Sequence, residues 1–135
     1  MTHGSIRVGV GGWTYEPWRG GTFYPEGLPH RRELEFAASK LTCIEINATY
    51  YRRQKPESFA RWAAATPDGF RFSLKALQYT MRRKVLADSK EIVDKFLNQG
   101  FTALGDRLGP ILWQFREGKR FEREDFARFL DLIPD

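Results

Sequence analysis

Four short apolar segments, rich in β-branched and aromatic residues, recur along the chain and most constrain its fold. They are residues 6–11 (IRVGVG), 43–47 (CIEIN), 70–75 (FRFSLK) and 110–115 (PILWQF). Each has the length of a β-strand, and the segments between them have apolar residues at helical spacing. Strands that alternate with helices are typical of a parallel sheet joined by right-handed crossovers. The sequence therefore predicts an α/β fold of about four βα units, half of a (β/α) barrel, with the helices outside the sheet.

The predicted helices follow each of these segments and cover residues 31–40, 56–65, 89–104 and 122–132. Pro56 suits the first turn of the second helix, and Ser89 is a candidate N-cap for the third. Gly100 is expected to kink the third helix or to end it early.

The composition fits a folded protein without a targeting or membrane segment. With 135 residues, 41% hydrophobic and 15% aromatic, the chain can form the core of one modest domain. We expect residues 1–5 to be disordered or vector-derived and residues 6–135 to form a single half-barrel domain. No apolar segment near residue 1 follows a basic region, and no apolar run is long enough to span a bilayer. We therefore expect no signal peptide and a cytoplasmic protein without membrane contact. Cys43 is the single cysteine, which excludes an intramolecular disulfide.

The loops that follow the predicted strands differ from those that precede them. Connections from strand to helix are long, at about 12–30, 48–55, 76–88 and 116–121, whereas connections from helix to strand are short. In parallel α/β folds the strand-to-helix loops gather at the C-terminal ends of the strands, where ligands bind. Any ligand site is therefore expected at that end of the sheet.

These long loops also carry the excess positive charge of the chain. Together they have a net charge of +6, against +5 for the whole protein. Basic and aromatic residues in the same loops suit contact with phosphate and stacking of a base or sugar. The candidate ligand-binding residues of this kind are Trp13, Tyr15, Trp18, Tyr50, Arg52, Arg53, Tyr79 and Arg82. The alternative is a solvated basic rim whose aromatics close the end of the sheet.

Polar residues within the strands also indicate a ligand site at the C-terminal ends of the strands. Side chains alternate between the two faces of a strand, and the apolar ones are expected to face the helices. Glu45, Asn47 and Lys75 would then share the opposite face, near the C-terminal ends, and Gln114 is expected to join them. Glu45 and Lys75 are candidate catalytic residues, as an acid/base or ligand-orienting pair. The alternative is an ion pair that only satisfies two charges.

Sequence motifs typical of metal sites and of dinucleotide-binding sites are absent from the sequence. The two histidines, His3 and His30, lie away from the predicted strand ends, and no His, Asp or Glu residues have metal-ligand spacing. Gly9, Gly11 and Gly12 are not followed closely by a helix start, unlike a dinucleotide-binding motif. We therefore expect no metal and no cofactor.

Four motifs, in order, resemble those of a known family. They are VGVGGWTY at 8–15 (with WRG at 18–20 and FYP at 23–25), IEINATYYR at 44–52, FRFSLK at 70–75 and LGPILWQF at 108–115. They resemble the N-terminal half of the YecE-like family, domain of unknown function 72. The resemblance implies a fold similar to a TIM barrel, and the family has no established biochemical activity.

The chain departs from this family pattern in three respects. Thr80-Met81 stands where the family usually has Thr-His, and Arg116-Glu117 stands where it usually has prolines. An acid/base role of that histidine would be lost here. The resemblance also implies members about twice as long, so that the last four βα units have no counterpart. Because open sheet edges invite pairing, we expect a homodimer or a partner that completes the barrel.

Three interpretations of function remain open from the sequence. The first is a YecE-like module that binds an anionic small molecule or nucleic acid through phosphate groups at the C-terminal face of the strands. The second is an enzyme, of hydrolase or lyase type, that acts on such a ligand. The third is a truncated, inactive copy.

Overall fold

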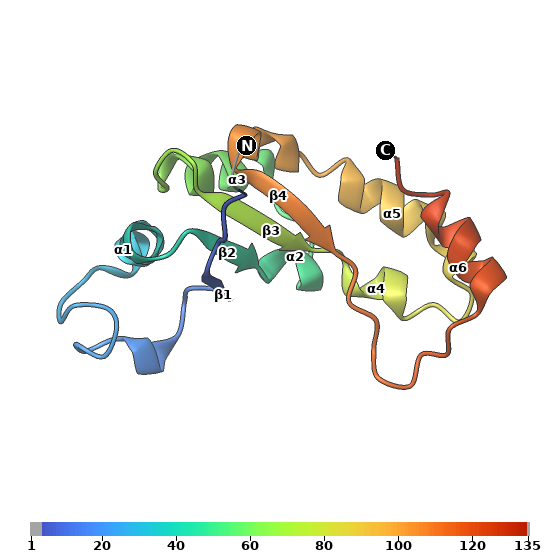
Figure 1. Ribbon diagram of the computed structural model, residues 1–135, viewed down its shortest axis with the longest axis horizontal. Coiled ribbons are helices and arrows are strands. Elements are labelled where there is room, and N and C mark those ends of the chain that lie inside the picture. The colour runs from blue at the N-terminus through green and yellow to red at the C-terminus, as the bar shows by residue number, and fades with distance from the viewer. Residues whose placement is uncertain (1–3, 135) are drawn as a thin grey trace.

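The computed structural model describes residues 4–134 and contains a four-stranded sheet (Figure 1). Its strands are β1 (Gly9–Gly11), β2 (Cys43–Ile46), β3 (Arg71–Lys75) and β4 (Leu108–Leu112). They lie in chain order and every neighbouring pair is parallel, so all four C-terminal ends lie at one end of the sheet. The predicted α/β fold of four βα units is confirmed. Residues 1–3 of the predicted disordered segment lie outside the described residues.

Four longer helices follow the four strands, as predicted. They are α1 (Glu33–Lys40), α3 (Pro56–Ala64), α5 (Lys90–Leu97) and α6 (Arg123–Leu130). Single turns outside the predicted helices are α2 (Ala48–Tyr51) and α4 (Gln78–Met81), together with the 3-10 segment η1 (Glu16–Trp18). The 3-10 segments η2 (His30–Arg32) and η3 (Leu86–Ser89) lead into α1 and α5, and η4 (Phe101–Arg107) overlaps the C-terminal part of the helix predicted at 89–104. Helices α2 and α4 come directly after β2 and β3. Single turns are too short to show a helical period, which is why the sequence did not reveal them.

One face of the sheet is packed and the other is not. Ile44 and Ile46 of β2 and Phe72 and Leu74 of β3 are each at most 1% exposed, whereas the residues between them are only partly buried. The buried set packs with apolar residues of α1, α3 and η4 in one continuous core. The alternation therefore determines which face of the sheet the helices cover.

Helices α5 and α6 form a second, smaller core beyond the strands. Figure 1 shows both helices past the arrowheads of β3 and β4. Val93 of α5 and Phe129 of α6 are buried together with Leu86, and Trp113 packs edge-on against Phe129 with ring centroids 5.2 Å apart. This core extends the molecule on the side of the C-terminal strand ends.

The predicted position of the fourth strand was wrong. The strand begins at Leu108 instead of residue 110 and ends at Leu112 instead of residue 115. Gly109 lies inside the strand, where a Cβ would lie 2.7 Å from the carbonyl oxygen of Phe72, so glycine allows the strands to approach. The chain after Leu112 leaves the sheet because Trp113 packs against α5 and α6.

The third predicted helix is shorter than expected. It ends at Leu97, and Gly100 adopts a left-handed conformation with φ 95° before η4 begins. A side chain would be strained at this φ, so Gly100 ends the helix instead of kinking it. Ser89 does occupy the N-cap position, but its hydroxyl donates to the carbonyl of Leu86 and does not cap the helix.

Among residues 4–134, none of the helices is both long enough and apolar enough to cross a membrane.

A glycine-to-alanine substitution tests the close pairing of β1 with β2. A Cβ at Gly9 would lie 1.8 Å from the carbonyl oxygen of Cys43, which no small shift can relieve. We expect Gly9→Ala to lower the free energy of unfolding by about 3 kcal/mol or more in urea titrations. Gly4→Ala, where a Cβ would meet nothing within 4 Å, is the control and should change stability by less than about 0.5 kcal/mol. Equal stability of the two variants would contradict the register of β1.

Candidate functional site at the C-terminal ends of the strands

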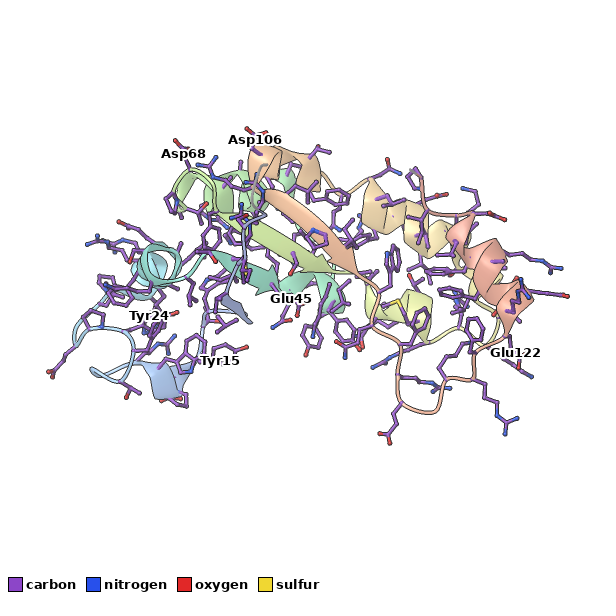
Figure 2. The ribbon with its side chains drawn as sticks, viewed as in Figure 1. Tyr15, Tyr24, Glu45, Asp68, Asp106 and Glu122 are labelled. Atoms are coloured by element: carbon purple, nitrogen blue, oxygen red, sulfur yellow. The ribbon has the colours of Figure 1, made fainter. Side chains whose placement is uncertain are left out.

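Two opposite charges face each other on the face of the sheet that the core leaves free. Glu45 of β2 and Lys75 of β3 approach to 3.5 Å between Oε1 and Nζ, and their side chains are 23% and 22% exposed. Figure 2 shows Glu45 beside the end of β2, with Tyr15 in the segment after β1. Partly exposed ion pairs of this kind stabilise a fold by about 0–1 kcal/mol. The pair therefore contributes little to the stability of the fold.

Helix α2 holds the ends of β2 and β3 together beneath this pair. The Thr49 hydroxyl is buried and lies 2.7 Å from the carbonyl oxygen of Lys75 and 3.0 Å from that of Ile46. The next residue, Tyr50, places its ring 5.7 Å from the Lys75 ammonium, a favourable cation–π arrangement. Lys75 is thus oriented both by a carboxylate and by an aromatic ring.

Asn47 supplies an unused hydrogen-bond acceptor next to the pair. Its Oδ1 is buried and has no hydrogen-bond partner among the described residues. A Cβ at either Gly11 or Gly12 would lie 3.3 Å from its Nδ2, so the two glycines leave room for the amide. An unpaired buried acceptor costs about 1–3 kcal/mol, and a hydroxyl or N–H of a ligand would remove that cost.

A hollow of about 290 Å³ adjoins Asn47. It is lined by Gly12, Trp13, Thr14, Tyr15, Asn47, Ala48 and Trp62. The Tyr15 hydroxyl donates to the carbonyl of Gly11, and Trp13 packs edge-on against Trp62 with ring centroids 5.5 Å apart. The walls are therefore aromatic, and their orientation is fixed by contacts within the protein.

The first long loop is anchored by an ion pair between the partly exposed Arg19 and a buried carboxylate. Arg19 donates to Glu33 with 2.6 Å between Nε and Oε1, and Glu33 is 1% exposed. Nearby, the buried Tyr24 hydroxyl donates to the carbonyl of Trp13, and burial, aided by the charge of Glu33, raises the pKa of Tyr24 to about 12. Trp18 packs against Tyr24 in this anchor and does not line the hollow. The charge of Arg19 is thus neutralised and unavailable to a ligand.

The other predicted site residues lie apart from this cluster. Arg52 and Arg53 are exposed in the loop after α2, and Gln114 is exposed beyond the end of β4. Tyr79 and Arg82 line a different hollow, between α4 and α5. The structure thus brings together Glu45, Lys75, Tyr50, Asn47, Trp13 and Tyr15, but not the remaining candidates.

Most cations of the long loops are free of carboxylates. No salt bridge within residues 4–134 involves Arg52, Arg53, Arg82, Arg83, Lys84, Arg116, Lys119 or Arg120. Lys119 instead donates to the carbonyls of Arg83 and Lys84, at 3.1 and 2.8 Å. The C-terminal side of the sheet therefore retains a positive field, which favours anions.

Position 81 belongs to the packed core and not to the site. Met81 is 1% exposed and belongs to the main core, so this position contributes packing and no functional group. Within the described part of the chain, no three His, Cys, Asp or Glu residues are grouped so that they could hold a metal ion.

Some residues of the site were not singled out from the sequence. Thr49 and Trp62 have no sequence signal, because their roles arise from contacts between separate elements. Gly11 and Gly12 were noted as part of an incomplete dinucleotide motif and of the family motif at 8–15, but not as site residues. A pair of glycines directly after a strand is a signal of close approach by another group, here the Asn47 amide, and could have been used.

The fold and this strand-end site define an α/β protein of the TIM-barrel type, built as four βα units. The model of the family described as protein of unknown function DUF72 matches residues 7–135. The chain therefore belongs to the DUF72 family.

Relatives and solved structures agree with this assignment. UPF0759 protein YecE of Escherichia coli K12 is 30% identical over 131 residues, and YunF of Bacillus subtilis 168 is 26% identical over 127 residues. The match covers 96% and 90% of this chain but 44% of each relative, so the chain spans less than half of their length. A crystal structure of the DUF72 family protein EF0366 from Enterococcus faecalis V583 aligns with a TM-score of 0.71 at 23% identity, over 95% of this chain and 46% of that one. At this identity the alignment supports the fold alone.

Proposed function

We propose that this protein binds a phosphate-bearing ligand, a small molecule or a nucleic acid, at the C-terminal ends of its strands. The observation that carries the proposal is the cluster of Glu45, Asn47 and Lys75 on the helix-free face. Asn47 Oδ1 accepts no hydrogen bond from any other residue of the described range 4–134, and the Lys75 ammonium is held 3.5 Å from the Glu45 carboxylate with both side chains partly exposed. Such groups at this end of a parallel sheet suit ligand contact.

The charges of the site indicate which part of the ligand each group would contact. The Glu45–Lys75 pair is neutral as a unit, and Asn47 Oδ1 needs a donor. A hydroxyl or amine of the ligand suits these acceptors, while its phosphate suits the unpaired cations of the surrounding loops. The ligand would therefore carry a hydrogen-bond donor as well as an anionic group.

An enzyme acting on the same ligand is the second candidate. A carboxylate and an ammonium at 3.5 Å could exchange a proton with a bound substrate. Binding alone is favoured because position 81 carries a buried methionine, so the site has no histidine there. Release of product from a phosphorylated substrate would establish the enzymatic alternative.

We also propose that a second copy of this chain closes the sheet. Strands β1 and β4 are the two edges, and each has one strand neighbour among the described residues. Val8 beside β1 and Leu112 in β4 are large apolar residues with 66% and 44% exposure. A two-fold axis along the strands would pair β4 of each copy with β1 of the other, and all eight strands would stay parallel.

The ligand proposal predicts opposite effects of two substitutions. We expect tripolyphosphate, titrated by calorimetry, to bind Lys75→Met several-fold more weakly than the wild type. Glu45→Gln should bind it equally or more tightly, because the competing carboxylate is removed. With about two phosphate contacts, affinity should fall roughly tenfold between about 50 and 200 mM salt.

Lys40→Met, on the exposed side of α1, is the control for loss of one charge and should leave binding unchanged. If Lys75→Met and Glu45→Gln bind as the wild type does and differ only in melting temperature, the pair is structural and the proposal fails.

The closure proposal predicts a dimer in solution. Light scattering should give twice the mass of the 15.7 kDa chain. Leu112→Lys should shift the protein towards monomer, because it places a charge on the pairing edge. Leu130→Lys, on an exposed position of α6, should not. A folded, monodisperse wild-type monomer would contradict self-closure, and so would equal dissociation by both variants.

A further inference from the structure

A second hollow lies between α4 and α5 and shares no residue with the one beside Asn47. Its volume is about 470 Å³, within the range of pockets that hold small molecules. The residues that line it are Leu77, Tyr79, Arg82, Arg83, Ile92 and Lys95. The hollow thus combines an apolar floor with a basic rim.

The chemistry of this hollow differs between floor and rim. Leu77 is 8% exposed and Ile92 is partly buried, so the floor is apolar and largely fixed by packing. Tyr79 is 50% exposed and offers a flat face for stacking. This combination suits a ring, aromatic or otherwise flat, held against the apolar floor.

Three cations surround the ring position. Arg82 and Arg83 follow α4 and are exposed, and Lys95 reaches the hollow from α5. Glu91 of α5 is already paired with Lys95 at 2.5 Å, and this contact, with a smaller contribution from Arg83, lowers the pKa of Glu91. The rim therefore keeps a net positive charge.

The segment that carries the arginines is held in place from two sides. Lys119 donates to the carbonyls of Arg83 and Lys84 at 3.1 and 2.8 Å. Just beyond, the Asp125 carboxylate of α6 accepts the backbone N–H groups of Leu86 and Ala87 at 2.8 and 3.0 Å. An anchored rim loses less conformational entropy on binding than a mobile loop would. The Lys119 ammonium also adds to the local positive charge.

We propose that this hollow is a separate binding site for a small phosphate monoester attached to a flat ring, a ligand of mononucleotide size. The ring would lie on Leu77 and Ile92 beside Tyr79, and the phosphate would bind Arg82 and Arg83. Guanidinium groups suit phosphate because they can donate two parallel hydrogen bonds. The site shares no residue with the cluster of Glu45, Asn47 and Lys75 that carries the proposed function.

Adenosine monophosphate tests the proposal, with adenosine and inorganic phosphate as its two parts. We expect the monophosphate to bind in calorimetry at least about tenfold more tightly than either part. The double variant Arg82→Ala/Arg83→Ala should weaken its binding by at least about tenfold. Neither arginine side chain donates a hydrogen bond within the described residues, so this variant should melt as the wild type does.

Controls separate this site from general charge effects and from the strand-end site. Arg31→Ala/Arg32→Ala removes two exposed arginines elsewhere and should leave monophosphate binding unchanged. Lys75→Met should also leave it unchanged. Tyr79→Leu should weaken it, whereas Tyr51→Leu, at another exposed tyrosine, should not.

Four outcomes would overturn the proposal. The first is equal binding by the wild type and by Arg82→Ala/Arg83→Ala, and the second is an equal loss in Arg31→Ala/Arg32→Ala. The third is a loss confined to Lys75→Met, which would favour the strand-end site and leave the proposed function intact. The fourth is tighter binding of a five-nucleotide single strand than of the monophosphate, which would indicate a nucleic-acid surface instead.

Discussion

The packing of the outer face of β2 and β3 is the constraint on which the rest of the structure depends. Ile44, Ile46, Phe72 and Leu74 must be covered, and α1, α3 and η4 cover them. Because strand side chains alternate, burying these residues turns Glu45 and Lys75 to the opposite side. The polar cluster at the strand ends is therefore a consequence of how the core is packed.

The uncovered face then determines what the protein can bind. The strands are parallel, so the loops after them gather at one end, and within residues 4–134 most of the loop cations have no salt bridge to a carboxylate, Arg19 excepted. Hydrogen bonds from Lys119 and to Asp125 hold part of this basic surface in a fixed arrangement. A rigid, positive and partly aromatic surface favours flat, phosphate-bearing ligands over neutral ones.

Sequence patterns predicted the sheet and its polar face because alternation is a local property. The period of two in 43–47 and 70–75 was enough to place Glu45 and Lys75 together. Features that depend on contacts between distant elements were missed: β4 starts at Leu108 because Gly109 approaches Phe72, and Arg19 is neutralised by Glu33. For the same reason the charge count included Arg19, and the sequence did not show that Tyr79 and Arg82 line a different hollow from the one beside Asn47.

Locating a phosphate mimic in a crystal tests the central claim, that anions bind at the C-terminal ends of the strands, most directly. Tungstate can be located by its anomalous scattering after a soak at low salt. The account predicts ordered tungstate on this side of the molecule, within hydrogen-bonding distance of Lys75 or of the loop arginines. Tungstate bound only at the opposite end of the sheet, or on the outer surfaces of α1 and α3, would contradict it.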